Sequence, residues 1–156
     1  QSTIDNNATS TEIRYLSRVY LATDIEKYKE AALEGIRYIL KAQYPNGGWP
    51  QFWPRPKGYY THITYNDNAM VNVMNLLRDV YNKKAPYTYV PDTLCQRARA
   101  AFDKGVECIL NTQVKQNGKL TVWCAQHDEH TLAPAKPVPM NFPHSAGPNR
   151  TTSSYC

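Results

Sequence analysis

Apolar residues recur at helical spacing in four stretches of the chain, and no stretch shows the apolar–polar alternation that is typical of a strand. Thr9 with Glu12, and Thr23 with Glu26, have the spacing of capping boxes at the starts of the first two helices. The sequence therefore predicts an all-α fold, with helices over about residues 9–20, 23–43, 66–81 and 91–113.

An internal repeat supports this interpretation. Residues 35–43 read GIRYILKAQ and residues 105–113 read GVECILNTQ, so Gly, Ile, Leu and Gln recur at an offset of 70 residues. Each segment leads into a glycine turn and then to a tryptophan, Trp49 in the first unit and Trp123 in the second. Helical units of this kind bury their apolar faces by stacking side by side. We therefore expect a partial α/α toroid whose connecting loops gather at one rim.

The loop after the second helix combines turn-forming residues with large aromatic rings. Pro and Gly recur throughout residues 44–60 and exclude a continuous helix or strand there. Aromatic rings on a loop offer much contact area and lose little conformational entropy on binding. We expect Trp49, Trp53 and Tyr60 to form a binding platform.

Two acidic motifs occupy the predicted rim. Asp67 lies in an Asn-Asp-Asn run, and Asp128-Glu129 is flanked by His127 and His130. A helix N-cap is the alternative role for Asp67, and a solvated acidic turn is the alternative for the second motif. If the repeat brings both motifs together, the carboxylates and nearby amides suit a hard cation such as Ca²⁺. The histidines leave a transition metal open, although their spacing matches no common zinc pattern.

Composition narrows the choice of partners. The 156 residues are enough for one domain, or for part of a larger one, and carry a net charge of +5. This charge favours an acidic partner, but the basic residues are scattered and form no block typical of nucleic-acid binding. No apolar run is long enough to cross a bilayer. Arg55, Lys57 and Lys136 are candidates for binding anionic groups.

Four cysteines are present without the CxxC spacing of a zinc site. Cys95 and Cys108 fall on one predicted helix, roughly 20 Å apart, which is too far for a disulfide. We expect buried free thiols at these positions and at Cys124 and Cys156.

Three long motifs resemble those of family 10 polysaccharide lyases, which are Ca²⁺-dependent pectate lyases: YPNGGWPQFWP, ITYNDNAMVNVMNLL and NGKLTVWCAQHDEHTLAPAK. The resemblance runs from the first helix to Lys136. It implies an α/α toroid, secreted or periplasmic, that cleaves polygalacturonate by β-elimination. By motif, Asp67 and Asp128 correspond to the Ca²⁺- and substrate-site acids, and Asn68 and Lys136 to substrate contacts.

The residues fit such a reaction. Removal of the C5 proton of a uronate builds negative charge on the adjacent carboxylate, and Ca²⁺ held by Asp67 and Asp128 would neutralise that charge. Trp49, Trp53 and Tyr60 would support the faces of sugar rings, and the basic surface would attract the polyanion.

The family pattern ends after Lys136. We predict a lyase-like domain over 1–136 and an aberrant, poorly ordered tail over 137–156. In a neighbouring reading frame, codons for the tail can spell Arg-Ala-Tyr-Glu-Leu-Pro-Ser-Leu-Ser-Gly, with which the family continues. Our hypothesis is a frameshift, which sequencing of the gene would test. The family's proton-abstracting arginine lies further downstream, and no residue here matches it.

Three functions stay open at this point. The chain is a pectate lyase-like protein, a non-catalytic module that binds acidic polysaccharide, or a structural helical-repeat fragment. A partial toroid leaves apolar helix faces uncovered, so we also expect self-association.

Overall fold

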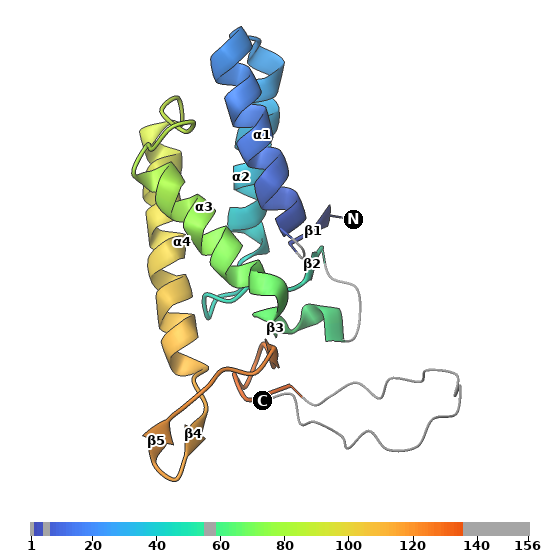
Figure 1. Cartoon of the computed structure of the whole chain (residues 1–156), viewed down its shortest axis with the longest axis vertical. Helices are drawn as coiled ribbons and strands as arrows, with labels where there is room; N and C mark the ends of the chain where they lie inside the picture. Colours follow the sequence, from blue (N-terminus) through green and yellow to red (C-terminus); the bar gives the residue numbers. More distant parts are fainter. Residues whose placement is uncertain (1, 5–6, 55–58, 136–156) are drawn as a thin grey trace, which may run out of the picture.

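Two helical hairpins lie side by side in the computed structural model, which describes residues 2–4, 7–54 and 59–135 (Figure 1). Helix α1 packs along α2 and helix α3 along α4, while α1 also contacts α3 and α2 contacts α4. This arrangement confirms the predicted all-α class within the described residues. The helices are α1 (Ala8–Thr23), α2 (Glu26–Ala42), α3 (Ala69–Tyr81) and α4 (Asp92–Asn111).

Both predicted capping boxes are wrong. Helix α1 already contains Thr9, whose hydroxyl donates a hydrogen bond to the carbonyl oxygen of Thr3 at 2.6 Å. Thr23 is the last residue of α1, and its hydroxyl donates back to the carbonyl oxygen of Val19 at 2.8 Å. Threonine hydroxyls bond to neighbouring backbone carbonyls as readily as they cap, so the spacing alone did not identify the helix starts.

The apolar faces predicted from periodicity form the core. Ile36 and Ile39 of α2 are fully buried against Met70, Val73 and Leu77 of α3 in one continuous cluster. Ile25 and Leu110 also lie at helical spacing in the predicted helices, but they are 45% and 61% exposed, and Ile25 precedes the first turn of α2.

The internal repeat is confirmed by matching hydrogen bonds. The indole Nε1 of Trp49 donates to the carbonyl oxygen of Ile39 at 2.9 Å, and the indole Nε1 of Trp123 donates to that of Ile109 at 2.7 Å. Ile39 and Ile109 occupy the same position in the two repeat segments. In both units, a tryptophan thus folds back onto the last turn of the helix that precedes it.

Short antiparallel ladders connect the loops. One ladder joins β1 (Ser2–Thr3) to β2 (Phe52–Trp53), and another joins β4 (Lys115–Gln116) to β5 (Lys119–Leu120). The third joins β3 (Ile63–Thr64) to β6 (Gln126–His127) and so links the loops of the two repeat units. Two 3₁₀ turns, η2 (Tyr59–Thr61) and η3 (Asn66–Asn68), flank β3.

The cysteines follow the prediction only in part. Cys95 and Cys108 are buried free thiols on α4. Cys124 is disulfide-bonded, which corrects the expectation of a free thiol there. Cys156, like the rest of the tail over 137–156, lies outside the described residues. In the described part of the chain, none of the helices combines the length and apolar character needed to cross a membrane.

Candidate functional site

The ladder between β3 and β6 builds the candidate site. Ile63 pairs with His127, and beyond the strands the amides of Tyr65 and Asn66 donate to the carbonyl oxygen of Ala125 at 2.9 and 3.1 Å. These contacts hold the acidic segment of the second unit against the start of α3. The predicted meeting of the two rim loops therefore occurs through a backbone ladder.

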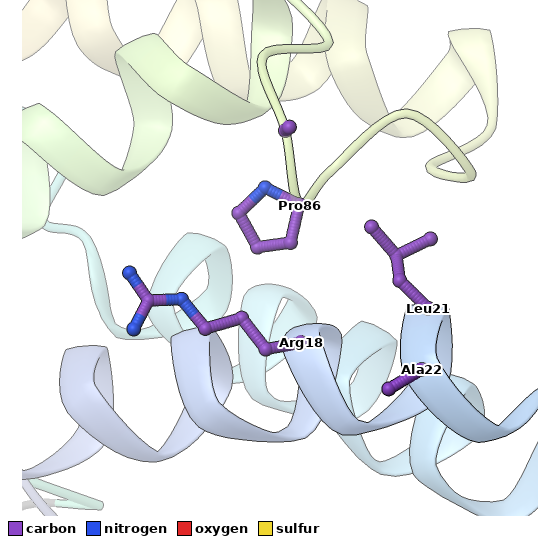
Figure 2. Close-up of a pocket in the computed structure, with 5 residues that line it drawn as sticks. Arg18, Leu21, Ala22 and Pro86 are labelled. Atoms are coloured by element: carbon purple, nitrogen blue, oxygen red, sulfur yellow. The ribbon is translucent and has the colours of Figure 1, made fainter.

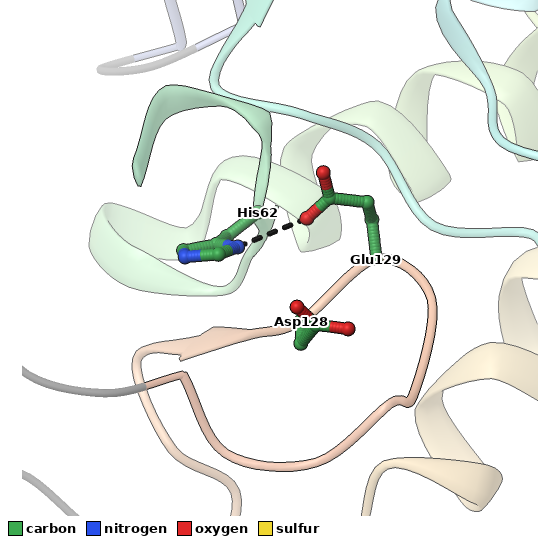
Figure 3. Close-up of side chains that lie close together, drawn as sticks. All are labelled: His62, Asp128 and Glu129. Atoms are coloured by element: carbon green, nitrogen blue, oxygen red, sulfur yellow. Dashed lines mark hydrogen bonds and ion pairs between the residues drawn. The ribbon is translucent and has the colours of Figure 1, made fainter. Parts of the chain in front are cut away.

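Three side chains that can bind a metal ion meet at one end of this ladder. His62 directly precedes β3, and Asp128 and Glu129 directly follow β6 (Figure 3). Their ligand atoms all lie within 4.8 Å of one another. The Nδ1 atom of His62 lies 2.9 Å from Oε2 of Glu129. We call this group the His62–Asp128–Glu129 cluster.

Asp128 is held as an ionised carboxylate by its own turn. Its Oδ1 atom accepts hydrogen bonds from the backbone amide of Thr131 at 2.7 Å, that of His130 at 3.0 Å and the hydroxyl of Thr131 at 2.9 Å. The two amides and then the hydroxyl lower the pKa of the Asp128 carboxyl below its ordinary value. All three bonds go to Oδ1, and within the described residues Oδ2 accepts no hydrogen bond.

Glu129 is tied to both repeat units. Burial by itself would raise the pKa of Glu129, but hydrogen bonds that include those from Thr61 and His62 outweigh it, and the pKa lies below its ordinary value. The carbonyl oxygen of Glu129 accepts a hydrogen bond from Nδ2 of Asn46 at 2.7 Å. Asn46 is fixed in turn, because its Oδ1 accepts from the amide of Gly48 at 3.1 Å. The glycine turn of the first unit therefore positions the acidic loop of the second.

His127 does not face the cluster. Its ring is fully buried and packs edge-on against Tyr65, with the ring centroids 5.5 Å apart. Its Nε2 accepts a hydrogen bond from the amide of Cys124 at 3.2 Å, so in the neutral ring the proton lies on Nδ1, which donates to the carbonyl oxygen of Leu132 at 2.9 Å. Both nitrogens are occupied, and His127 is a structural residue rather than a metal ligand.

Because the ring of His127 is buried, we expect the folded chain to lose stability in mild acid. Burial lowers the pKa of His127 below its ordinary value, so in mild acid the unfolded chain binds a proton that the folded chain does not. The free energy of unfolding should therefore fall as the pH decreases from about 7 to about 5. Urea unfolding across this range measures the slope. In the His127→Gln variant the slope should be shallower, and an unchanged slope would contradict the assignment.

Asp67 and Asn68 lie near the opposite end of the same ladder and are exposed. Both have left-handed backbone conformations, with φ of 50° and 58°, which cost about 1–3 kcal/mol each for residues other than glycine. Neither side chain caps α3, and Oδ2 of Asp67 instead accepts a hydrogen bond from Nδ2 of Asn66 at 2.6 Å. Asp67 is not a member of the His62–Asp128–Glu129 cluster.

The structure corrects the predicted aromatic platform at one of its three residues. Trp49 is fully buried, so it belongs to the core and offers no ring face to a ligand. Trp53 is half-buried, packs edge-on against Tyr38 with ring centroids 5.6 Å apart, and lies 5.3 Å from Nζ of Lys41. Tyr60 is also half-buried. The predicted anion-binding residues Arg55, Lys57 and Lys136 lie outside the described residues.

The sequence did not indicate His62 or Asn46 as site residues. His62 reaches the cluster through a strand pair whose partners are 64 positions apart, Ile63 and His127. A two-residue strand carries no periodicity that could reveal this pairing. Asn46 reads as a turn residue, and its contact with Glu129 depends on how the two units stack.

A separate hollow of about 420 Å³ lies at the far end of the bundle, between α1 and the α3–α4 connection (Figure 2). It is lined by Arg18, Leu21, Ala22, Ala85 and Pro86. None of these five lining residues is acidic, in contrast to the cluster beside the β3–β6 ladder.

This chain resembles pectic acid lyases in both sequence and structure. A family described as pectic acid lyase matches residues 1–149, which extends past Lys136. A solved structure of a family 10 polysaccharide lyase from Cellvibrio cellulosa is 41% identical, with a TM-score of 0.81 over 84% of this chain and 41% of that one. A point mutant of a family 10 polysaccharide lyase from the same organism, in complex with trigalacturonic acid, is 40% identical, with the same TM-score over 84% and 42% of the two chains. No curated protein matches this chain.

The two solved structures extend well beyond this chain, which spans less than half of their length. Over the shared part, the TM-score is consistent with a partial α/α toroid, as predicted. The family match covers nearly all of the sequence and includes the ladder and the cluster on it. By fold and by sequence, this chain belongs to the pectic acid lyase family.

Proposed function

We propose that this chain acts on polygalacturonate as a pectate lyase-like protein, by Ca²⁺-dependent β-elimination, or binds it without cleavage if no base is in place. The observation that carries the proposal is the meeting of His62, Asp128 and Glu129 at the end of the β3–β6 ladder. A family 10 lyase of similar structure is seen in complex with trigalacturonic acid, which supports an acidic sugar chain as the ligand. Secretion to the extracellular space or the periplasm is part of this proposal.

The donor set of the cluster fits Ca²⁺. Calcium takes oxygen ligands, and the carboxylates of Asp128 and Glu129 both have a pKa below the ordinary value, so both are charged at neutral pH. Imidazole nitrogen is a poor ligand for Ca²⁺, and His62 instead orients Glu129 through the 2.9 Å contact between Nδ1 and Oε2. Asp67, at the other end of the ladder, is proposed to reach the ion or the substrate on the same rim.

Each residue then has a task in the elimination. A base takes the C5 proton, and negative charge develops on the uronate carboxylate. The C4–C5 double bond then forms as the C4–O bond breaks, and its electron pair leaves with the oxygen of the departing sugar, which takes up a proton. Bound Ca²⁺ supplies the positive charge that stabilises this carboxylate. Asp128 and Glu129 would hold the ion, and Asp67 would reach the ion or the substrate from the other end of the ladder. Asn68 is proposed to donate a hydrogen bond to the sugar chain, and the half-buried rings of Trp53 and Tyr60 are proposed to contact sugar rings. Lys136 stays a proposed substrate contact, and a lysine or water is proposed to remove the proton.

The ultraviolet absorbance of unsaturated product on polygalacturonate tests the function, first with Ca²⁺ and then with a chelator. A Ca²⁺-dependent rise identifies a lyase. Binding that depends on Ca²⁺ without a rise in absorbance identifies a non-catalytic polysaccharide-binding module. If neither binding nor product depends on Asp67 and Asp128, the chain is a structural helical-repeat fragment and the proposal fails.

Asn46 is expected to strengthen Ca²⁺ binding, because its hydrogen bond holds the backbone of Glu129 in place. Replacing Asn46 by Ser keeps an oxygen that can accept from the amide of Gly48, but the shorter side chain cannot reach the carbonyl oxygen of Glu129. We expect Ca²⁺ affinity to fall by about 10-fold, as is usual when a group that orients a metal ligand is lost. Isothermal titration with Ca²⁺ measures this loss.

The control for Asn46→Ser is Asn82→Ser. Asn82 follows α3, and its side chain donates to the carbonyl oxygen of Arg78, far from the cluster. An affinity that changes equally in both variants would show that Asn46 has no specific role in the site.

A further inference from the structure

Tyr65 lies between strand β3 and the turn that carries Asp67, and its side chain reaches the second repeat unit. The residue directly follows β3 and directly precedes η3. Its backbone amide donates to the carbonyl oxygen of Ala125, and its ring packs edge-on against His127. His127 in turn directly precedes Asp128. Tyr65 therefore belongs to the segment that carries one acidic motif and contacts the segment that carries the other.

The phenol of Tyr65 is anchored to the end of α4. Its oxygen lies 2.6 Å from Oγ1 of Thr112, the residue that follows the last turn of α4. The same Oγ1 atom lies 2.8 Å from the carbonyl oxygen of Cys108 and 3.1 Å from that of Ile109. A carbonyl oxygen can only accept, so the single hydroxyl proton of Thr112 is used there. The phenol of Tyr65 is therefore the donor in its bond to Thr112.

This hydrogen bond is shielded from water. Thr112 and Cys108 are both buried, and Sγ of Cys108 lies 3.9 Å from the phenol oxygen of Tyr65. Burial raises the pKa of Tyr65 well above its ordinary value, so the phenol keeps its proton at neutral pH. Water cannot replace a partner that a buried donor loses. The bond therefore fixes the phenol at one position against α4.

The turn that carries Asp67 depends on contacts outside itself. Asp67 and Asn68 both have left-handed backbone conformations, which persist only where the surrounding structure holds them. Oδ2 of Asp67 accepts its hydrogen bond from the neighbouring Asn66, and Asn68 does not cap α3 with its side chain. The turn is joined to the second unit by two backbone amides on the ladder and by the phenol of Tyr65.

We propose that Tyr65 is a positioning residue for the candidate Ca²⁺ site. Its hydrogen bond to Thr112 fixes the start of η3 against the end of α4, and its ring holds His127 on the other side. The separation of the Asp67 and Asp128 carboxylates is thereby set before an ion or a sugar chain binds. Groups that are already in place bind more tightly, because less order has to be gained on binding. This inference rests on the proposed Ca²⁺-dependent function.

The far end of the bundle contains a matching pair of hydrogen bonds. The phenol oxygen of Tyr89 lies 2.8 Å from Oγ of Ser17, and Ser17 donates to the carbonyl oxygen of Ile13 at 2.7 Å. Burial raises the pKa of Tyr89 as well. Tyr89 lies on the connection between α3 and α4, at the opposite end of these helices from β3 (Figure 1). Tyr89→Phe therefore removes an equivalent hydroxyl and is the matched control for Tyr65→Phe.

Isothermal titration of the whole chain with Ca²⁺ tests the proposal. Tyr65→Phe keeps the ring on His127 and removes only the hydroxyl, so the affinity for Ca²⁺ should fall by about 10-fold. Thr112→Val removes the acceptor of the same bond and should also bind more weakly, whereas Thr112→Ser keeps the acceptor and should bind like the wild type. The double variant Tyr65→Phe/Thr112→Val should lose clearly less than the sum of the two single losses, because both substitutions remove one bond.

Urea unfolding separates positioning from general structural support. Tyr65→Phe and Tyr89→Phe should both unfold at a lower urea concentration than the wild type, since each loses a hydrogen bond from a phenol. Only Tyr65→Phe should lose affinity for Ca²⁺. Far-ultraviolet circular dichroism checks that each variant folds. If Tyr65→Phe does not fold, the comparison of Thr112→Val with Thr112→Ser decides the same question.

Three outcomes would overturn the proposal. If the wild type binds Ca²⁺ and Tyr65→Phe binds it equally well, Tyr65 does not position the site, and the proposed function is unaffected. If Tyr89→Phe loses as much affinity as Tyr65→Phe, the loss of stability alone explains the effect. If the wild type does not bind Ca²⁺, the proposed function fails and this inference fails with it.

Discussion

Replacing Asp128 by Asn should lower the affinity of the chain for Ca²⁺ by about 100-fold or more. Asparagine keeps the Oδ1 oxygen that accepts three hydrogen bonds from His130 and Thr131, so the turn is preserved. The substitution removes the negative charge and one anionic ligand from the His62–Asp128–Glu129 cluster. Isothermal titration with Ca²⁺ measures the loss, and the lyase or binding activity on polygalacturonate should fall with it.

The matched control is Asp103→Asn. Asp103 lies on α4, is exposed and forms an ion pair with Arg99, so this variant changes the net charge equally without touching the cluster. Its Ca²⁺ affinity should stay close to that of the wild type. If both variants lose affinity to the same extent, the cation binds through the overall charge and the cluster is not its site.

Replacing Trp49 by Ala should destabilise the fold by about 3–5 kcal/mol. The ring is fully buried, its Nε1 atom donates to the carbonyl oxygen of Ile39, and it packs against Gly105 of α4. The substitution leaves a cavity between the two hairpins and an unpaired carbonyl group. Urea unfolding at low protein concentration measures the loss in the free energy of unfolding.

Trp123→Ala provides the comparison, because Trp123 makes the same hydrogen bond to the equivalent carbonyl but is 40% exposed. Its cost should be clearly smaller, since less apolar area returns to water. Equal losses in the two variants would contradict the structural role of Trp49. Under conditions in which Trp49→Ala remains folded, its affinity for polygalacturonate should be unchanged, because the ring does not reach the surface.

Helical periodicity predicted most of the scaffold. The apolar faces of α2, α3 and α4 were identified because residues such as Ile36, Val73 and Ala98 recur at the spacing of a helix and become the core. The repeat of Gly, Ile, Leu and Gln was also informative, since Ile39 and Ile109 accept the same tryptophan hydrogen bond in the two units. Gln43 and Gln113 both donate to carbonyl oxygens of the loops that follow them.

Short sequence patterns predicted the helix ends and loops less reliably than periodicity predicted the helices. Thr9 and Thr23 had the spacing of capping residues but bond to other carbonyls. Trp49 lies in a loop rich in Pro and Gly and was assigned to a binding surface. Such a loop can also turn back into the core, and the glycine at position 47 allows it to lie directly on α4. Burial of a loop residue depends on its neighbours in space, which local composition does not report.

The sequence by itself determined the helices, the repeat, the family motifs and the acids Asp67 and Asp128 as candidates. Only the tertiary structure decided which side chains join them. The β3–β6 ladder brings His62 to Asp128 and Glu129, and Asn46 reaches Glu129 across the two repeat units. Helical periodicity is a local property that neighbouring residues share, whereas these contacts join residues far apart in the chain. They form because the packing of the two hairpins brings short loops together.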